Sequence, residues 1–238
     1  MKERPILFSA PMVRAILSGT KTQTRRILKL KWGFDLEERD DGTLWPWAEH
    51  PDCDEDVWMP CPQGDIGDRL WVREAFRFPA SLDHLSPSVC GDKALDAGYR
   101  TPWAPTQFEA DGSRTGEWRG FDTPPEKTKP GKLRPGIHMP RWASRIALDI
   151  KAVRVERLQD ISEADARAEG IECMAGDPEC GYRNYLDQTS LDWSLSPRES
   201  FRSLWESING PASWAKNPYV WVVEFERAQA QQKGSHEG

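Results

Sequence analysis

Residues that could act as a nucleophile, a base and an anion ligand lie close together near the N-terminus, in the segment GTKTQTRR at positions 19–26. The hydroxyl of Thr24 can attack an amide carbonyl if a neighbouring group accepts its proton. Lys21 becomes such an acceptor if burial and the charges of Arg25 and Arg26 lower its pKa, because both disfavour the ammonium form. Arg26 suits a carboxylate or a phosphate through its planar fork of donors. The pattern also fits a solvated basic turn, with Thr24 an ordinary strand residue.

A short helix is predicted immediately before this segment. Residues 5–9 have the pattern of a short apolar strand, and Ser9 and Pro11 then suit the cap and the first turn of a helix. Gly19 is placed to end that helix, because glycine accepts the left-handed backbone conformation at little cost. The basic segment would then emerge at a helix C-terminus, where cations are electrostatically favoured.

The remaining regular elements are expected at 68–74, 146–158 (with a bulge near Ala152) and 219–227 as strands, and at 162–170 and 197–209 as helices. Ser162 and Ser196 each stand three residues before an acidic residue, a spacing typical of a helix N-cap. The apolar stripe of the second helix is predicted to be core; it consists of Phe201, Leu204, Trp205 and Ile208. Short strands with peripheral helices indicate an α+β fold.

Three segments without clear periodicity, at about 30–66, 77–135 and 174–195, are predicted to be insertions in a single domain that spans residues 1–227. The second is expected to lie over the main fold, and residues 228–238 are expected to form a disordered tail. Of the tryptophans, Trp71, Trp205 and Trp221 fall on strand or helix stripes and are expected in the core. The tryptophans of the insertions either pack the insertions onto the main fold or form a platform on which bases stack. We favour the packing role.

Three blocks of the sequence, in this order, resemble those of the ASCH family, which belongs to the PUA-like superfamily. The first is the signature G-x-K-x-x-x-x-R, from Gly19 to Arg26; the second is 67–74 (GDRLWVRE), and the third is 161–170 (ISEADARAEG). The long insertions resemble those of the larger family members from phages and prophages. The resemblance implies a PUA-like β-barrel with peripheral helices, and a cleft beside the signature that holds a nucleotide or RNA.

The resemblance also implies a chemistry. Some small bacterial members are amidohydrolases that remove the acyl group from N4-acetylcytidine with a lysine and a threonine of the signature and a later glutamate. Carried over by position, these catalytic residues are Lys21, Thr24 and Glu169. Glu169 would hold Lys21 or carry the proton to the leaving amine, although it could equally be an ordinary helix-end residue. The alternatives are a non-catalytic module that binds a nucleoside, a nucleotide or single-stranded RNA, and a ribonuclease.

The candidate ligand-binding residues are Gly19, Arg25, Arg26, Glu74 and Arg141. For Glu74 we favour a structural ion pair with Arg26 or Arg73. Arg141 lies in a second basic stretch, with Arg134, His138 and Arg145, that could form another wall of an anion site.

The net charge of −6 hides an uneven distribution. Residues 14–31 hold only basic residues among their charged side chains, and residues 126–157 hold nine Lys or Arg against three acids, whereas residues 35–60 hold ten acids and one Arg. Basic islands in an acidic chain favour a local anion-binding site over general affinity for nucleic acid.

The five cysteines are scattered, and their odd number argues against a disulfide framework. Cys173 and Cys180 are loosely spaced for a zinc site, so we expect free thiols and no metal or other cofactor. The sequence has no apolar run long enough to span a membrane, and its N-terminus lacks the apolar stretch of a signal peptide. We therefore expect a cytoplasmic protein. The sequence does not indicate an oligomeric state.

Overall fold

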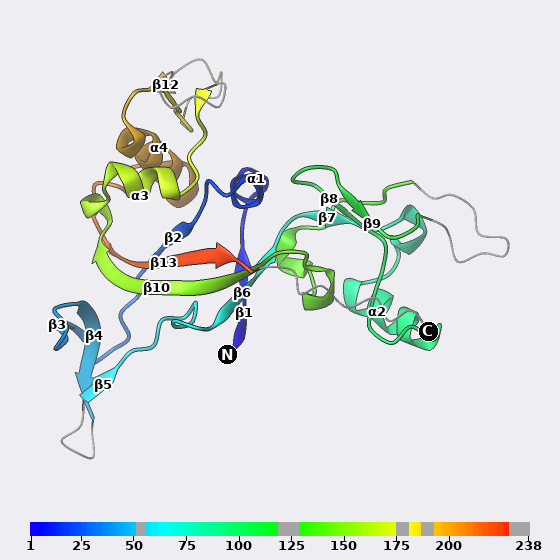
Figure 1. The fold of residues 1–238 in the computed structure, drawn as a ribbon, viewed down its shortest axis with the longest axis horizontal. Helices are drawn as coiled ribbons and strands as arrows, with labels where there is room; N and C mark the ends of the chain where they lie inside the picture. The colour runs from blue at the N-terminus through cyan, green and yellow to red at the C-terminus, as the bar shows by residue number, and fades with distance from the viewer. Residues whose placement is uncertain (51–55, 119–128, 175–180, 187–192, 229–238) are drawn as a thin grey trace.

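The computed structural model describes residues 1–50, 56–118, 129–174, 181–186 and 193–228, and the protein has a mixed α+β fold (Figure 1). The expected disordered tail lies almost wholly outside these residues, as do parts of the insertion at 174–195. The described α-helices are α1 (Ala10–Ser18), α2 (Pro87–Asp96), α3 (Glu163–Ala168) and α4 (Pro197–Asn209). The expected α+β class is therefore confirmed.

A five-stranded sheet forms the centre, in the order β1 (Glu3–Leu7), β6 (Arg69–Arg73), β10 (Ala147–Arg157), β13 (Tyr219–Arg227) and β2 (Gln23–Ile27). The pair β1 and β6 is parallel, and the other pairs are antiparallel. Among the described strands β1 and β2 end the sheet and do not pair with one another, so the sheet is not a closed barrel there. The register between β10 and β13 shifts between Ile150 and Ala152, which confirms the predicted bulge.

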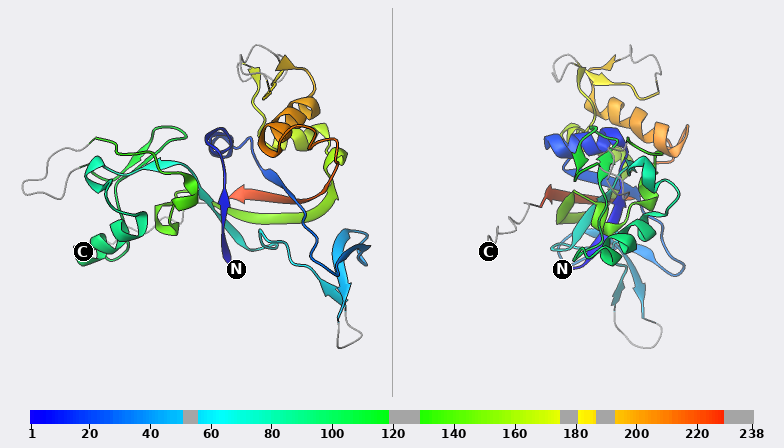
Figure 2. Two further views of the ribbon diagram at one scale, coloured as in Figure 1. Left: turned by 180° about the vertical axis from the view of Figure 1, so that it is seen from behind. Right: turned by 90° about the vertical axis from the view of Figure 1, so that its right-hand side faces the viewer.

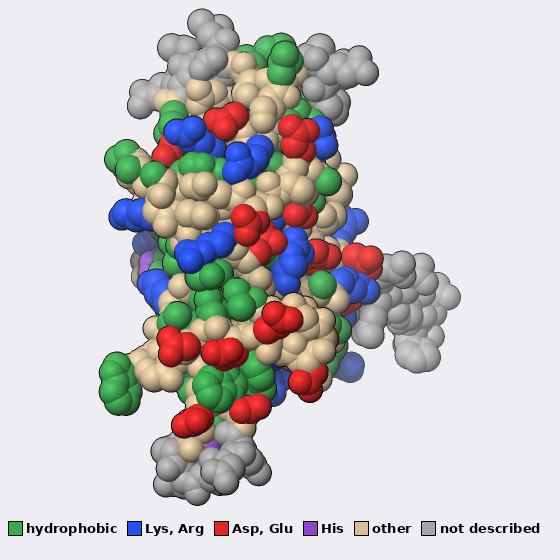
Figure 3. Space-filling view, turned by 90° about the vertical axis from the view of Figure 1, so that its left-hand side faces the viewer, with side chains coloured by type: hydrophobic (Ala, Val, Ile, Leu, Met, Phe, Trp, Pro, Cys, Tyr) green, Lys and Arg blue, Asp and Glu red, His purple; other side chains and the backbone are tan. Residues whose placement is uncertain are grey.

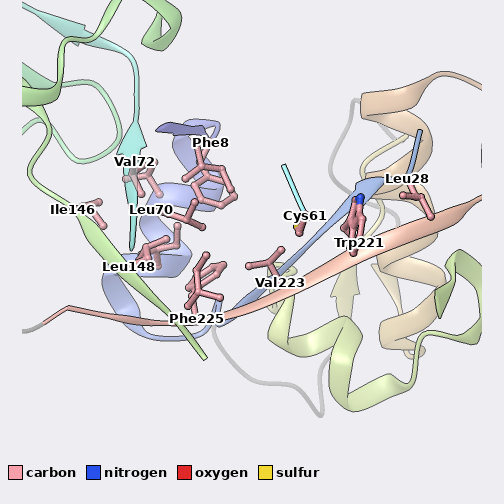
Figure 4. Close-up of a cluster of buried hydrophobic side chains, with 14 of the residues drawn as sticks. Phe8, Leu28, Cys61, Leu70, Val72, Ile146, Leu148, Trp221, Val223 and Phe225 are labelled. Carbon is pink, nitrogen blue, oxygen red and sulfur yellow. The ribbon is translucent and has the colours of Figure 1, made fainter. Parts of the chain in front are cut away.

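Strand β13 links two hydrophobic cores because successive side chains of a strand point to opposite faces. Trp221, Val223 and Phe225 pack with Phe8 and Leu70 on one face (Figure 4). On the other face Val220 and Val222 pack under α3 and α4 with the buried side chains of Phe201, Trp205 and Trp214. The helices α3 and α4 thereby cover one side of the sheet, next to its edge strand β2 (Figure 1).

The ends of the predicted helices agree with the sequence pattern except at one cap. Ser162 accepts a hydrogen bond from the amide of Asp165, and Ser196 accepts one from Glu199, as expected for N-caps. Gly19 ends α1 in the left-handed conformation, at φ 80°. Ser9 stands at the N-cap of α1, but within the described structure its side chain makes no capping hydrogen bond. The start of this helix therefore depends on Pro11 in its first turn and on the burial of its apolar side chains.

The segment 30–66 is more regular than the sequence suggests. It contains a three-stranded antiparallel sheet of β3 (Asp35–Glu38), β4 (Leu44–Glu49) and β5 (Asp56–Trp58). Trp45 of β4 packs edge-on against Trp221 of the central sheet, with ring centroids 4.9 Å apart. The strands are short and interrupted by Pro46, which explains why their alternation is hard to recognise in the sequence.

The segment 77–135 also has its own structure, and it lies beside the central sheet rather than over it (Figures 1 and 2). It holds α2 and two strands, β8 (Thr106–Phe108) and β9 (Arg114–Thr115), which form a sheet with β7 (Phe76–Arg77). A separate core fills this part, with Phe76, Phe78, Phe108 and Met139 at its centre. The expectation of irregular chain was wrong here because these elements are short and separated by many prolines.

Candidate functional site

The signature residues do not form a solvated turn: the second half of the signature is the edge strand β2. Thr24 lies opposite Val223 of β13 and Arg25 lies opposite Val222. Before the strand, the backbone of Lys21 forms an antiparallel bridge with Glu169, which directly follows α3. The pairing with β13 anchors the segment, and Lys21 and Arg25 are buried, so the alternative of a solvated basic turn was wrong.

Lys21 and Glu169 form a buried ion pair. Lys21 is 2% exposed, and its Nζ donates to the carbonyl oxygen of Glu169 at 2.7 Å and to its Oε2 at 2.8 Å. Burial lowers the pKa of the Lys21 amine, an effect that the neighbouring Glu169 opposes and that Arg26 and Arg25 reinforce. The lysine is thereby shifted toward the neutral form that a base requires.

Glu169 is held from a second side by Arg25. The Nη1 of Arg25 donates to Oε1 of Glu169 at 3.1 Å, so each oxygen of this carboxylate faces a different cation. Arg25 also binds Glu156 through Nε and Nη2, at 3.0 and 2.6 Å, and its Nη2 lies 3.3 Å from Oδ2 of Asp165. Arg154 completes the network by contacting Glu156, Asp165 and Glu224.

A small cavity of about 70 Å³ lies at the edge of β2. Its polar wall contains four of the predicted site residues, Thr24, Arg25, Arg26 and Glu169, and consecutive residues reach it because β2 is an edge strand. Its apolar wall comes from α1, β2 and α4, through Met12, Ile27, Phe201, Leu204, Trp205 and Ile208, with Asn209 beside them. Lys21 is not among the lining residues and reaches the cavity only through Glu169.

Thr24 and Arg26 both line this cavity and both carry hydrogen-bonding side chains. The guanidinium of Arg26 donates to the carbonyl oxygen of Leu7 at 3.0 Å and lies 5.5 Å from the ring centroid of Phe8. Since an arginine has five N–H donors, Arg26 retains donors for a ligand.

The other candidate ligand residues lie outside the cavity. Glu74 is buried and binds Arg145 through both oxygens, at 2.8 and 2.9 Å, so the expected partners Arg26 and Arg73 were wrong although a buried ion pair is present. Arg141 forms a partly exposed pair with Glu3 on the first strand.

Gly19 serves to end α1. The proposed second wall is not part of this cavity either, because Arg134 donates to the carbonyl oxygens of Leu82 and Leu85 in the separate core region.

Sequence reasoning missed the acids that surround Arg25 and part of the apolar wall. Arg154 and Glu156 stand two positions apart on β10, and this alternation was the available signal that they share a face. In α4, Leu204 is only half-buried and Ile208 is 57% exposed, so the end of the predicted core stripe lines the cavity instead. Trp71, Trp205 and Trp221 are buried as predicted.

Among the described residues, no group of three or more His, Cys, Asp or Glu is arranged to hold a metal ion. None of the described helices combines the length and the apolar character needed to cross a membrane. On the face shown in Figure 3, acids predominate around β3 to β5, and basic and acidic side chains are interspersed elsewhere.

Comparison with known proteins returned no match to this chain, whether among protein-family models, curated proteins or solved structures.

Proposed function

We propose that this protein hydrolyses a small amide, of the kind found in N4-acetylcytidine and related acylated nucleosides, at the cavity beside β2. One observation carries the proposal: Lys21 is hydrogen-bonded to Glu169, and Glu169 and Thr24 line the same small cavity. A nucleophile, a titratable pair and a cationic donor at one small cavity are the groups that amide hydrolysis needs.

In the proposed reaction the Oγ1 of Thr24 attacks the acyl carbon while its proton passes to the pair formed by Lys21 and Glu169. Arg26 donates to the carbonyl oxygen as that oxygen becomes negative. The C–N bond then breaks, and the leaving amine takes up a proton from the pair. Water hydrolyses the resulting ester of Thr24, which releases the carboxylic acid and restores the hydroxyl. Because Glu169 lies between Lys21 and the cavity, Glu169 is the member that exchanges protons with the substrate.

The size of the cavity restricts the substrate. Pockets that enclose a drug-sized ligand usually measure about 300–1,000 Å³. A cavity of about 70 Å³ therefore holds the acyl group, while the nucleoside stays at its rim, near the exposed Ile208 of α4.

The alternative of a non-catalytic module for nucleotides or single-stranded RNA is less well supported. Phosphate contacts by proteins rely on lysine and arginine side chains that can reach the backbone. Lys21 and Arg25 are buried and bind carboxylates. Of the three cations in this segment, only Arg26 is left to contact a phosphate.

The test is to incubate the purified protein with N4-acetylcytidine and to measure cytidine by reversed-phase chromatography. Cytidine should form with the wild type, and both Lys21→Ala and Thr24→Val should abolish its release. Thr22→Val is the matched control, because Thr22 is exposed, and it should retain activity.

Intact substrate after long incubation at high protein concentration, or full activity in Thr24→Val, would refute the proposed reaction. Salt-sensitive binding of single-stranded RNA by a protein that leaves the amide intact would favour the binding module.

A further inference from the structure

Arg25 lines the cavity, but most of its donors are already committed. Its side chain is fully buried, and its three nitrogens bind Glu156 and Glu169, with Asp165 within ion-pair distance. A ligand in the cavity would have to compete with these carboxylates for the guanidinium, since at most one of its five N–H donors is left over. Arg25 is therefore poorly suited to bind substrate, although the sequence had suggested that role.

The position of Arg25 matters instead for Glu169. Two cations hold this carboxylate from different sides, Lys21 at Oε2 and Arg25 at Oε1, and the second cation is itself fixed by Glu156 on β10. A carboxylate with both oxygens engaged has a fixed orientation. Arg25 also balances the charge of Glu169 without requiring that Lys21 be protonated.

The charged groups around Lys21 can be followed element by element. Glu169 faces it from the end of α3, and Arg25 and Arg26 lie on β2. From the β1 side the ring of Phe8 lies against the amine, 5.6 Å from Nζ to the ring centroid. Arg25 is therefore one of two cations that disfavour the ammonium form of Lys21, against one acid that favours it.

We propose that Arg25 is a positioning residue for the reaction proposed above, on which this inference rests: it fixes the carboxylate of Glu169 and allows Lys21 to release its proton. Arg25 does not touch the substrate in this scheme. If Arg25 had only a structural role, its removal would lower stability. It would not change the titration of Lys21 or the pH dependence of activity.

The experiment compares Arg25→Gln with wild type in two measurements on the full chain. The first follows the ¹³Cε chemical shift of Lys21 with pH, assigned with the help of Lys21→Met, and does not depend on activity. The second is the pH profile of kcat and KM with N4-acetylcytidine. Arg145→Gln is the matched control, because Arg145 likewise holds a buried glutamate, Glu74, but lies outside the cavity.

In Arg25→Gln the titration midpoint of Lys21 should rise, since the variant lacks a cation near the amine. The rising limb of kcat against pH should move by the same amount, with KM little changed, whereas Arg145→Gln should move neither. An unchanged midpoint in Arg25→Gln overturns the inference even if the enzyme is active. A shifted midpoint in a protein that hydrolyses no amide supports the role of Arg25 and overturns only the proposed function.

If Arg25→Gln does not fold, Arg25→Lys serves as the second variant. A lysine keeps the charge but cannot hold Glu156 and Glu169 together in the way a guanidinium fork does. Its Lys21 midpoint should stay near the wild-type value while kcat falls about tenfold or more, since a misplaced proton carrier slows proton transfer. Full wild-type kcat in Arg25→Lys would overturn the positioning role.

Discussion

Lys21 and Glu169 are joined at three points although they are 148 positions apart in the chain. Their backbones form a β-bridge, the Lys21 amine donates to the Glu169 carbonyl oxygen, and the same amine donates to the Glu169 carboxylate. The end of α3 is thus tied to the segment that precedes β2. A shift of either partner moves the other, so the titratable pair behaves as one unit beside the cavity.

The first prediction concerns the cost of breaking this unit. Glu169→Gln removes the anion between two buried cations, and it should lower the free energy of unfolding by about 3 kcal/mol at neutral pH. Adding Lys21→Met removes one of the uncompensated cations, so the double variant should lose less than the sum of the two single changes. Urea denaturation of the four proteins measures this coupling. Strict additivity would contradict the description of a coupled pair.

The sequence predicted the elements around this site better than the surroundings of its side chains. The strand that begins near residue 219, the bulge near Ala152 and the cap at Ser162 follow from local patterns, because alternation, turn chemistry and capping act between near neighbours. The burial of Lys21 and Arg25 depends on Glu169 and Glu156, more than 100 positions away. Such long-range pairing has no local signal, and the sequence alone therefore left a solvated turn open as an alternative.

The family resemblance placed Lys21, Thr24 and Glu169 in one site. The structure bonds Lys21 to Glu169 and sets Thr24 and Glu169 on one cavity, whereas the apolar wall of that cavity was not expected. Leu204 and Ile208 have the spacing of a core stripe, and only the edge of the sheet decides that they meet a cavity. In the same way, the pairing of Glu74 with Arg145 instead of Arg73 depends on how residues 141–145 fold back onto β6.

The second prediction follows from the apolar wall. Leu204→Ala should enlarge the cavity and shift the ratio of kcat/KM from acetyl toward butyryl amides of cytidine, by about tenfold, since one or two methylene groups contribute about 1–3 kcal/mol of discrimination. Leu195→Ala is the control, because Leu195 is 80% exposed and does not line the cavity. Competition between the two substrates measures the ratio. The same selectivity in Leu204→Ala and wild type would place the acyl group elsewhere.

The third prediction concerns stability in acid. The hydrogen bond and charge of Arg145, together with Ser113, hold the pKa of Asp111 at about 2, below its ordinary value of 3.8. Because the folded-state pKa is lowered, this carboxylate stabilises the fold above its unfolded pKa, and the contribution is lost as pH falls from about 4 toward 2. Asp111→Asn should therefore lower the free energy of unfolding by at most about 1 kcal/mol at neutral pH, since the pair is partly exposed. Urea titrations should show the difference vanish near pH 2; a difference that is constant with pH would contradict the assignment.

The last prediction tests whether the backbone around Lys21 must be closely packed for the site to work. Gly170 follows Glu169 at φ 78°, and a Cβ placed there would lie 2.7 Å from Cβ of Lys21 and 2.8 Å from Cβ of Ala15. Gly170→Ala therefore adds a clash to the strain of a left-handed alanine, whereas Gly67→Ala, at φ 84° with no atom within 4 Å of the new Cβ, adds the strain alone. Gly67→Ala should lower the free energy of unfolding by about 1–2 kcal/mol and keep full activity. Gly170→Ala should lower it further and reduce kcat, because both Lys21 and Ala15 must give way to the new Cβ and a displaced Lys21 loses its alignment with Glu169. Equal stability and equal activity of the two variants would show that the packing of Lys21 against Gly170 has no part in catalysis.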